Sequence, residues 1–216
     1  MIKEDWLKGL CEADCVILAN GKFPDAEQPL QVLRSARVVV CCDGAVANLI
    51  AFGMEPTAIV GDLDSFPSEL KDRFADRLFH FPDQYSNDLT KAVLWCKERG
   101  YGNIAILGAT GLREDHTLGN IGLLSRYNEL GVSVQAFTDH GILSVTHKTK
   151  QFASYKGQQV SFFSTNPTTR VTTHNLLYPL EKSPLPELWM GTLNESLGHW
   201  FKLELDDGWL VVFQTY

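Results

Sequence analysis

The hydrophobic positions along the chain change their rhythm near residue 140. Before that point, short and nearly continuous apolar runs alternate with stretches of helical periodicity. Such runs are typical of strands buried on both faces of a largely parallel sheet. The predicted strands are residues 15–19, 37–42, 58–60, 78–81, 104–107 and 132–137, and the predicted helices include residues 44–53, 89–98 and 118–130. Strands that alternate with helices indicate βαβ units, and therefore an α/β domain.

The second half of the chain has the pattern of an antiparallel all-β domain. Its predicted strands are short β-branched or aromatic runs at residues 142–148, 159–164, 170–178, 199–205 and 209–214. The turn Asp206-Asp207-Gly208 between the last two runs predicts a hairpin. We therefore predict an α/β domain over residues 1–138 and a β-sandwich or barrel over residues 139–216.

Composition and charge exclude several classes of protein. The 216 residues carry a formal net charge of −7 without a basic stripe, which disfavours nucleic-acid binding. No apolar run approaches the roughly 20 residues that span a membrane, and the N-terminal residues lack the pattern of a signal peptide. The cysteines at positions 11, 15, 41, 42 and 96 follow no zinc-binding spacing. We interpret them as reduced, mostly buried thiols of a cytoplasmic protein.

Two carboxylates, Asp62 and Asp64, follow the third predicted strand. At the carboxyl end of a buried strand they would point into the crevice where open α/β sheets bind ligands. Clustered carboxylates need a cation or a shared proton, and Mg²⁺ commonly binds one or two of them together with substrate phosphates. The pair suggests metal-assisted phosphate chemistry, although an acidic turn that caps a helix would have the same sequence.

Three more polar clusters lie where predicted strands end. Asp43 follows the second strand and could meet a ligand or cap the next helix. Residues 83–88 follow the fourth, where a helix start could bind phosphate and Asp88 a metal, or where the acid could merely favour the helix dipole. Residues 108–116 follow the fifth, and Arg113 is either a bidentate phosphate ligand or part of a solvated loop. Since successive strand ends converge on one crevice, the clusters support one another.

These segments together resemble the thiamine pyrophosphokinase family along nearly the whole chain. The chain contains neither a P-loop nor a G-x-G-x-x-G fingerprint, so ordinary P-loop kinases and simple dinucleotide oxidoreductases fit poorly. The matching segments are residues 18–21, 42–45, 56–65, 82–84, 87–92 and 108–116 with Asn120, and residues 177–180 and 191–195 in the second half.

The resemblance implies transfer of a pyrophosphoryl group from ATP to the hydroxyl of thiamine, giving thiamine diphosphate and AMP. It implies a nucleotide-binding α/β domain with Mg²⁺ and a thiamine-binding β-sandwich, in a homodimer whose active sites lie between subunits. The implied metal ligands are Asp62, Asp64 and Asp88, and the implied catalytic set adds Arg113 and Asp115. The implied nucleotide contacts are Asn20, Gly21, Asp43, Gln84, Asn87, Lys91 and Arg113, and the implied thiamine contacts are Thr192, Asn194 and Trp200.

The chain departs from the family pattern at three positions. The family usually has Thr in place of Asn87, Gly in place of Leu112 and Ser in place of Leu193. The last change removes a hydroxyl near thiamine unless Thr192 replaces it. Trp189 and Trp200 could stack on the cationic thiazolium or fill the sandwich core.

Two alternative functions remain open. The chain could be a diphosphokinase for another hydroxymethyl heterocycle, such as a pterin, or a nucleotide sensor without turnover. The intact set Asp62, Asp64, Asp88 and Arg113 argues against the sensor, because binding alone would not require so many metal-binding acids.

Overall fold

The computed structural model describes Trp6, residues 13–164 and residues 166–216, and it forms two compact units. One unit is Ala13–Asp139, and the other contains His140–Tyr216 together with Trp6, whose indole donates a hydrogen bond to the carbonyl of Ala153 (2.8 Å). The predicted combination of a mostly parallel sheet with an antiparallel β domain is confirmed.

The first unit is built on six parallel strands in the order β6-β5-β1-β2-β3-β4. The strands are β1 (Cys15–Leu18), β2 (Val39–Cys42), β3 (Ala58–Gly61), β4 (Leu78–His80), β5 (Asn103–Leu107) and β6 (Ser133–Phe137). The chain leaves the neighbouring strands β1 and β5 in opposite directions. Ligands bind at such a switch point, at the carboxyl ends of the strands.

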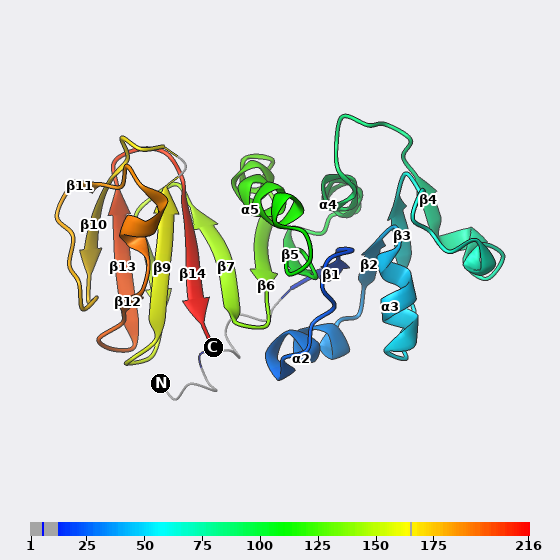
Figure 1. Ribbon diagram of the computed structural model, residues 1–216, viewed down its shortest axis with the longest axis horizontal. Helices are drawn as coiled ribbons and strands as arrows, with labels where there is room; N and C mark the ends of the chain where they lie inside the picture. Colours follow the sequence, from blue (N-terminus) through cyan, green and yellow to red (C-terminus); the bar gives the residue numbers. More distant parts are fainter. Residues whose placement is uncertain (1–5, 7–12, 165) are drawn as a thin grey trace. The chain divides into compact units, whose positions relative to one another are not determined.

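The longer helices of this unit are α2 (Glu27–Ser35), α3 (Ala45–Ala51), α4 (Asp88–Glu98) and α5 (Glu114–Glu129), and η1 (Ser68–Leu70) and η2 (Ala75–Arg77) are short 3₁₀ turns. Figure 1 shows α4 beside α5 on one side of the sheet, with α2 and α3 on the other. Helix α2 was not predicted, and α5 begins four residues before its predicted start. The side chain of Asp43 does not cap α3, whose N-cap is Gly44, so that alternative is wrong.

The second unit consists of two antiparallel sheets, with strand orders β12-β9-β14-β7 and β11-β10-β13-β8. The strands are β7 (Gly141–Thr146), β8 (Lys150–Ala153), β9 (Gln159–Ser164), β10 (Arg170–His174), β11 (Ser183–Pro184), β12 (Asn194–Glu195), β13 (Trp200–Leu205) and β14 (Leu210–Thr215), with the 3₁₀ turn η3 (Leu188–Gly191) before β12. The short strand β8 was not predicted, and β10 ends before Asn175, whose φ is +60°.

The predicted hairpin at residues 206–208 is wrong. Strand β13 pairs with β8 and β10, whereas β14 pairs with β7 and β9, so this turn connects the two sheets. The Asp206 carboxylate accepts a hydrogen bond from the Arg170 amide (2.8 Å), which keeps the end of β13 on β10. Gly208 then provides a φ of +78°, and the chain enters the other sheet.

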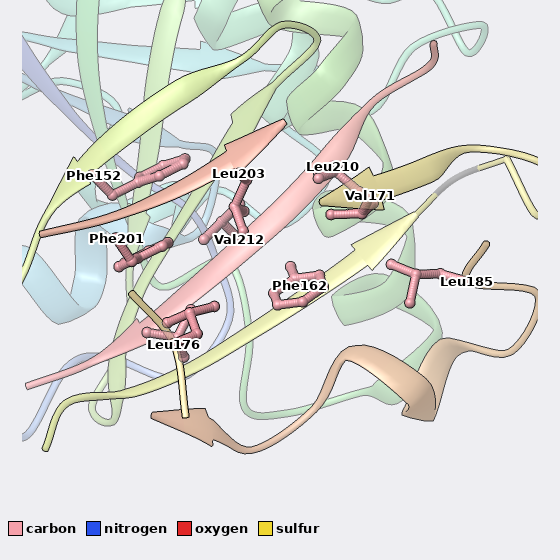
Figure 2. Packing of buried hydrophobic residues seen from close by; sticks show 10 residues of the cluster. Phe152, Phe162, Val171, Leu176, Leu185, Phe201, Leu203, Leu210 and Val212 are labelled. Atoms are coloured by element: carbon pink, nitrogen blue, oxygen red, sulfur yellow. The ribbon is translucent and has the colours of Figure 1, made fainter. Parts of the chain in front are cut away.

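A single hydrophobic core joins the two sheets of the second unit (Figure 2). Its buried side chains come from β9 and β14 of one sheet, from β8, β10 and β13 of the other, and from Leu176 and Leu185 outside the strands. The rings of Phe152 and Phe201 stack with their centroids 4.9 Å apart. Two antiparallel sheets that share a core form a β-sandwich.

Two predictions made from composition can be compared with the described residues. Cys15, Cys41, Cys42 and Cys96 are buried free thiols, as predicted, and Cys11 lies outside the described residues. Within the described part of the chain, no helix has both the length and the apolar character that a membrane span needs.

Candidate functional site

A pocket of about 510 Å³ lies in the α/β unit, where the segments that follow several strands meet. The predicted convergence of these segments on one crevice is therefore confirmed. The predicted site residues that line it are Asn20, Gly21, Asp62, Gln84, Asn87, Asp88, Lys91 and Arg113. Leu112, where the family pattern has Gly, also lines the pocket with 64% of its surface exposed.

Three carboxylates form a tight cluster, and two of them, Asp62 and Asp88, line this pocket. Asp43, Asp62 and Asp88 each offer one oxygen, and these oxygens lie within 4.8 Å of one another. Asp43 is 2% exposed, and its Oδ2 accepts a hydrogen bond from the Ser65 amide (2.8 Å). Among the residues that the structure describes, none donates a hydrogen bond to its buried Oδ1. Because an unpaired buried carboxylate oxygen is costly, this atom favours a bound cation or a proton.

The pKa of Asp43 also indicates that its carboxylate needs a bound cation or a proton. Burial raises the pKa of its carboxyl above the ordinary value, and the charges of Asp88 and Asp62 raise it further, against the opposing hydrogen bond from Ser65. The donor set consists only of carboxylate oxygens, which are hard ligands that suit Mg²⁺. The residues present therefore fit a magnesium ion.

Lys91 supplies part of the compensating charge. Its side chain is 3% exposed, and its Nζ lies 3.1 Å from Asp88 Oδ1 and 3.5 Å from Asp62 Oδ2. Burial alone would lower the pKa of Lys91, but its interactions with Asp88 and Asp62 outweigh this effect and raise the pKa. One ammonium group thus pairs with two of the three carboxylates, which leaves the cluster short of positive charge.

Asp64 lies outside this cluster, and the structure brings Asp43 there instead. The Asp64 side chain is exposed, and its amide donates to Asp62 Oδ1 (3.3 Å), a hydrogen bond that lowers the pKa of Asp62. Between the two aspartates, Leu63 has a φ of +65°, a strained value for a residue with a branched side chain. The pairing of β2 with β3 brings Asp43 close to Asp62, and this adjacency depends on the strand order, which the sequence pattern did not give.

Gly61 allows the acids to approach one another. A Cβ atom at this position would lie 3.0 Å from the Cβ of Asp43 and 3.2 Å from the Cγ of Asp88. Both distances are shorter than ordinary van der Waals contacts, so any side chain would push the carboxylates apart.

We therefore expect Gly61→Ala to destabilise the fold by about 1–3 kcal/mol, since the extra methyl group overpacks the end of β3. The measurement is urea unfolding of the metal-free protein. Gly119→Ala is the matched control, because this helical position in α5 has no atom within 4 Å of a built Cβ. The control should be stabilised by up to about 1 kcal/mol. An equal response of the two variants would contradict the crowding argument.

Asn87 caps α4 and connects it to α5. Its Oδ1 accepts hydrogen bonds from the amide (3.0 Å) and hydroxyl (2.7 Å) of Thr90. Its Nδ2 donates to Asn120 Oδ1 (3.1 Å), and Asn120 in turn donates to the carbonyl of Ala109 (2.8 Å). Asn87 is thus the N-cap of α4, and through Asn120 it also holds the loop that leads to Arg113.

Helical spacing could have identified Asn120 as a residue that lines the pocket. The sequence pattern placed the start of the last helix at residue 118, whereas α5 begins at Glu114. With the observed start, Arg113, His116, Thr117 and Asn120 fall on one face of the helix, and all four line the pocket.

Arg113 and Asp115 form a bidentate ion pair at the start of α5. The guanidinium donates to the two carboxylate oxygens at 3.0 and 2.5 Å. The hydrogen bond from Arg113 lowers the pKa of Asp115 to about 2, with a further contribution from the His116 amide. Both side chains are exposed, so Arg113 is held in orientation while it remains open to a ligand.

The predicted thiamine contacts of the second unit have different environments. Asn194 is buried, and its amide group bonds to both the N–H (3.0 Å) and the carbonyl (2.7 Å) of Tyr178. The Thr192 hydroxyl donates to the carbonyl of Trp189 (2.7 Å). Trp189 and Trp200 are 71% and 40% exposed, so the alternative that they fill the sandwich core is wrong.

Leu193 replaces the hydroxyl residue of the family pattern. It has a φ of +56°, its side chain is 68% exposed, and its amide donates to the Ser161 hydroxyl (3.1 Å).

The fold and the pocket define a two-domain protein in which a doubly wound α/β unit with an acidic site precedes a β-sandwich. Residues 30–136 match the family described as thiamin pyrophosphokinase, catalytic domain, and residues 141–213 match the corresponding substrate-binding domain. The chain belongs to the thiamin pyrophosphokinase family.

Curated relatives and solved structures agree with this assignment. The chain is 30% identical over 130 residues to Thiamin pyrophosphokinase 1 of Caenorhabditis elegans, which covers 56% of this chain and 53% of the relative. It is 32% identical over 146 residues to Thiamine pyrophosphokinase 1 of Oryza sativa subsp. japonica, which covers 56% and 54%. The matches thus span about half the length of these curated relatives.

The fold resembles those of solved thiamine pyrophosphokinases. The Bacillus subtilis structure has a TM-score of 0.78 at 20% identity and covers 93% of this chain and 98% of its own. The yeast structure has a TM-score of 0.79 at 16% identity, with 95% and 87% covered. At these identities the likeness establishes the fold.

Proposed function

We propose that the protein transfers a pyrophosphoryl group from ATP to the hydroxyl of thiamine, giving thiamine diphosphate and AMP. The observation that carries the proposal is the carboxylate cluster of Asp43, Asp62 and Asp88, in which Oδ1 of Asp43 has no hydrogen-bond partner among the described residues. Asp62 and Asp88 line the same pocket as Arg113. A cation-demanding cluster next to a phosphate-binding side chain suits a metal–triphosphate ligand. The names of the curated relatives support the choice of acceptor.

We propose that Mg²⁺ is held by Asp43, Asp62 and Asp88, with Asp64 as a further ligand. When bound, the ion neutralises charge on the phosphates of ATP. The exposed Arg113 binds phosphoryl oxygens through its planar fork, and Asp115 holds that fork in orientation. Asn20, Gly21, Gln84 and Asn87 line the same pocket and are the proposed further nucleotide contacts, with Lys91 as the buried counter-charge.

In the proposed reaction, the alcohol oxygen of thiamine attacks the β-phosphorus in line. A bond forms between these two atoms, the bond from the β-phosphorus to the oxygen that it shares with the α-phosphorus breaks, and AMP leaves with that oxygen. Asp62 and Asp64 are the candidate acceptors of the alcohol proton. Positioning and charge neutralisation account for most of the catalysis in transfers of this kind.

The β-sandwich would supply recognition of thiamine in a homodimer with shared sites. Several large apolar side chains are exposed on this unit: Leu177, Tyr178, Leu188, Trp189, Met190, Leu193, Leu197 and Trp200. Exposed apolar surface of this extent is typical of a binding or subunit interface, and an aromatic face attracts a cationic heterocycle. Asn194 would act here by fixing Tyr178, since its amide is bonded to that residue. The buried free thiols suit the reducing cytoplasm as the proposed location.

An assay of AMP release tests the proposed function. The protein is supplied with Mg-ATP and, in separate reactions, with thiamine and with pterin alcohols. AMP formation that requires both thiamine and Mg²⁺ is the expected result. Turnover with a pterin alcohol alone would indicate the other diphosphokinase, and ATP binding without AMP release from any acceptor would indicate a nucleotide sensor.

Mixed dimers test the proposed sharing of sites. Asp62→Asn removes an acid of the α/β unit, and Trp200→Ala removes an exposed ring of the sandwich. After subunit exchange of the two inactive variants in equal amounts, we expect about a quarter of wild-type activity, because half the dimers are mixed and one of their two sites is intact. Differently tagged chains show that mixed dimers have formed. If mixed dimers form and no activity is recovered, each site lies within a single subunit.

A further inference from the structure

Two loops that line the pocket are bonded to each other. The loop after β1 contains Asn20 and Gly21, and the loop after β5 leads to Arg113. The Gly21 amide donates to the carbonyl of Gly108 (2.8 Å), and the Lys22 amide donates to the carbonyl of Thr110 (2.9 Å). A Cβ atom on Gly21 would lie 2.3 Å from that Gly108 oxygen, so the close approach requires a glycine. The position of the second loop thus depends on the first.

Asp139 holds the first loop in place from a distant part of the sequence. Its Oδ1 accepts hydrogen bonds from the amides of Asp25 (2.7 Å) and Ala26 (3.0 Å), and its Oδ2 accepts one from Lys22 Nζ (2.9 Å). Ala26 is the N-cap of α2 and lacks a side-chain cap of its own. Through these hydrogen bonds Asp139, whose side chain is only 17% exposed, acts as the cap of α2.

Lys22 also contacts the second loop, so it connects that loop to Asp139. Its stem packs against Gly111, where a built Cβ would lie 2.8 Å from Lys22 Cβ and 3.4 Å from Lys22 Cδ. Its Nζ also pairs with Asp25 (2.6 Å), and the hydrogen bonds that it donates to Asp25 and Asp139 raise the pKa of the ammonium group. Gly111 lies two residues before Arg113, so the contact is made close to the phosphate-binding side chain.

We propose that Lys22 and Asp139 are positioning residues of the pocket, because their ion pair fixes the loop that presents Arg113 to the phosphates of the nucleotide. Neither residue is among those that line the pocket, so both act through the two loops. The identity of the ligand rests on the proposed function, whereas the ordering of the loop does not.

Hydrogen exchange in the full-length protein without ligands tests the ordering directly. In Lys22→Met, which keeps the stem and removes the charge, we expect the amides of residues 109–113 to exchange roughly three- to fivefold faster, as the loss of a half-exposed ion pair would give. Lys22→Arg should restore the wild-type rate. The control is Arg34→Met, which removes the ion pair of Arg34 with Glu27 on α2, away from the pocket.

A second readout connects the loop to the nucleotide. In the AMP-release assay, Lys22→Met should raise the KM for Mg-ATP roughly three- to fivefold and leave kcat within about twofold. The reason is that part of the binding free energy of Mg-ATP would then be used to order the loop. Unchanged exchange in Lys22→Met, or an equal change in Arg34→Met, would overturn the proposal. Faster exchange with an unchanged KM would overturn the role in nucleotide binding. Faster exchange in a protein that releases no AMP from any acceptor would overturn the proposed function and leave the ordering of the loop established.

Discussion

Replacing Asp43 with Asn should abolish AMP formation and at the same time make the metal-free protein more stable. The asparagine keeps an oxygen for the Ser65 amide but removes the anionic Oδ1 that has no partner in the structure. Loss of one ligand of the metal site should lower kcat/KM on the order of a thousandfold, since a bound metal supplies several kcal/mol of transition-state stabilisation. Steady-state kinetics at saturating Mg²⁺ measure this loss.

The stability of the same variant changes in the opposite direction because of the pKa of Asp43. Burial and the neighbouring acids raise that pKa, so the ionised group costs stability at pH values above its ordinary pKa, where the unfolded chain is already ionised. The neutral amide removes this cost, and we expect the melting temperature without metal to rise by about 2–4 °C. Added Mg²⁺ should raise the melting temperature of the wild type more than that of Asp43→Asn.

The exposed Asp72 provides the matched control for this experiment. Asp72→Asn makes the same chemical change away from the acidic cluster and the pocket, and it should affect neither turnover nor the response to Mg²⁺. If Asp43→Asn kept wild-type turnover at limiting Mg²⁺, the assignment of Asp43 as a metal ligand would be wrong.

Arg113→Lys should lower kcat/KM about a hundredfold or more while the protein stays folded. The guanidinium makes two hydrogen bonds to Asp115 through Nε and Nη2, which leaves Nη1 without a bond to that carboxylate in a side chain that lines the pocket. A lysine keeps the charge but offers no planar fork, so it cannot reproduce bidentate contacts to Asp115 and to a phosphoryl oxygen. Kinetics with varied Mg-ATP and saturating thiamine separate the loss of binding from the loss of turnover.

The control for Arg113 lies on the same helix. Arg126 pairs with Glu129 on the exposed surface of α5, and Arg126→Lys should leave the kinetics unchanged. If Arg113→Lys behaved like this control, Arg113 would be an ordinary solvated side chain of the loop.

The strands of the α/β unit could be predicted because each is a short apolar run, and β1, β2 and β3 are buried along their whole length. The polar segments after these strands were predicted to meet, and they do, since the geometry of a parallel sheet brings strand ends to one edge. Helix α2 could not be found in this way. It contains Pro29 in its first turn, and the group that caps it is Asp139, 113 residues beyond Ala26. A contact of that range leaves no local sequence signal.

The exchange of Asp43 for Asp64 in the acidic cluster has a similar cause. Spacing along the chain favours the pair Asp62 and Asp64, whereas Asp43 comes from a neighbouring strand and is identified only when β2 is placed next to β3. The hairpin predicted at residues 206–208 fails for the same reason. Its turn residues are correctly recognised, but the sheet to which each flanking strand belongs depends on pairing with β8, β10, β7 and β9.

The buried Lys91 gives the acidic cluster a simple charge balance. Three carboxylates and one ammonium group sum to two negative charges, which is the charge that one divalent cation cancels. A site with this balance can persist between turnovers, because the lysine limits the repulsion that three bare carboxylates would exert on the fold. Asp64, the proposed further ligand, is not part of this balance, and water screens its charge because its side chain is exposed. The cluster itself therefore has no electrostatic reason to retain a second cation once the nucleotide has left, and any second ion would have to arrive and depart with the phosphates.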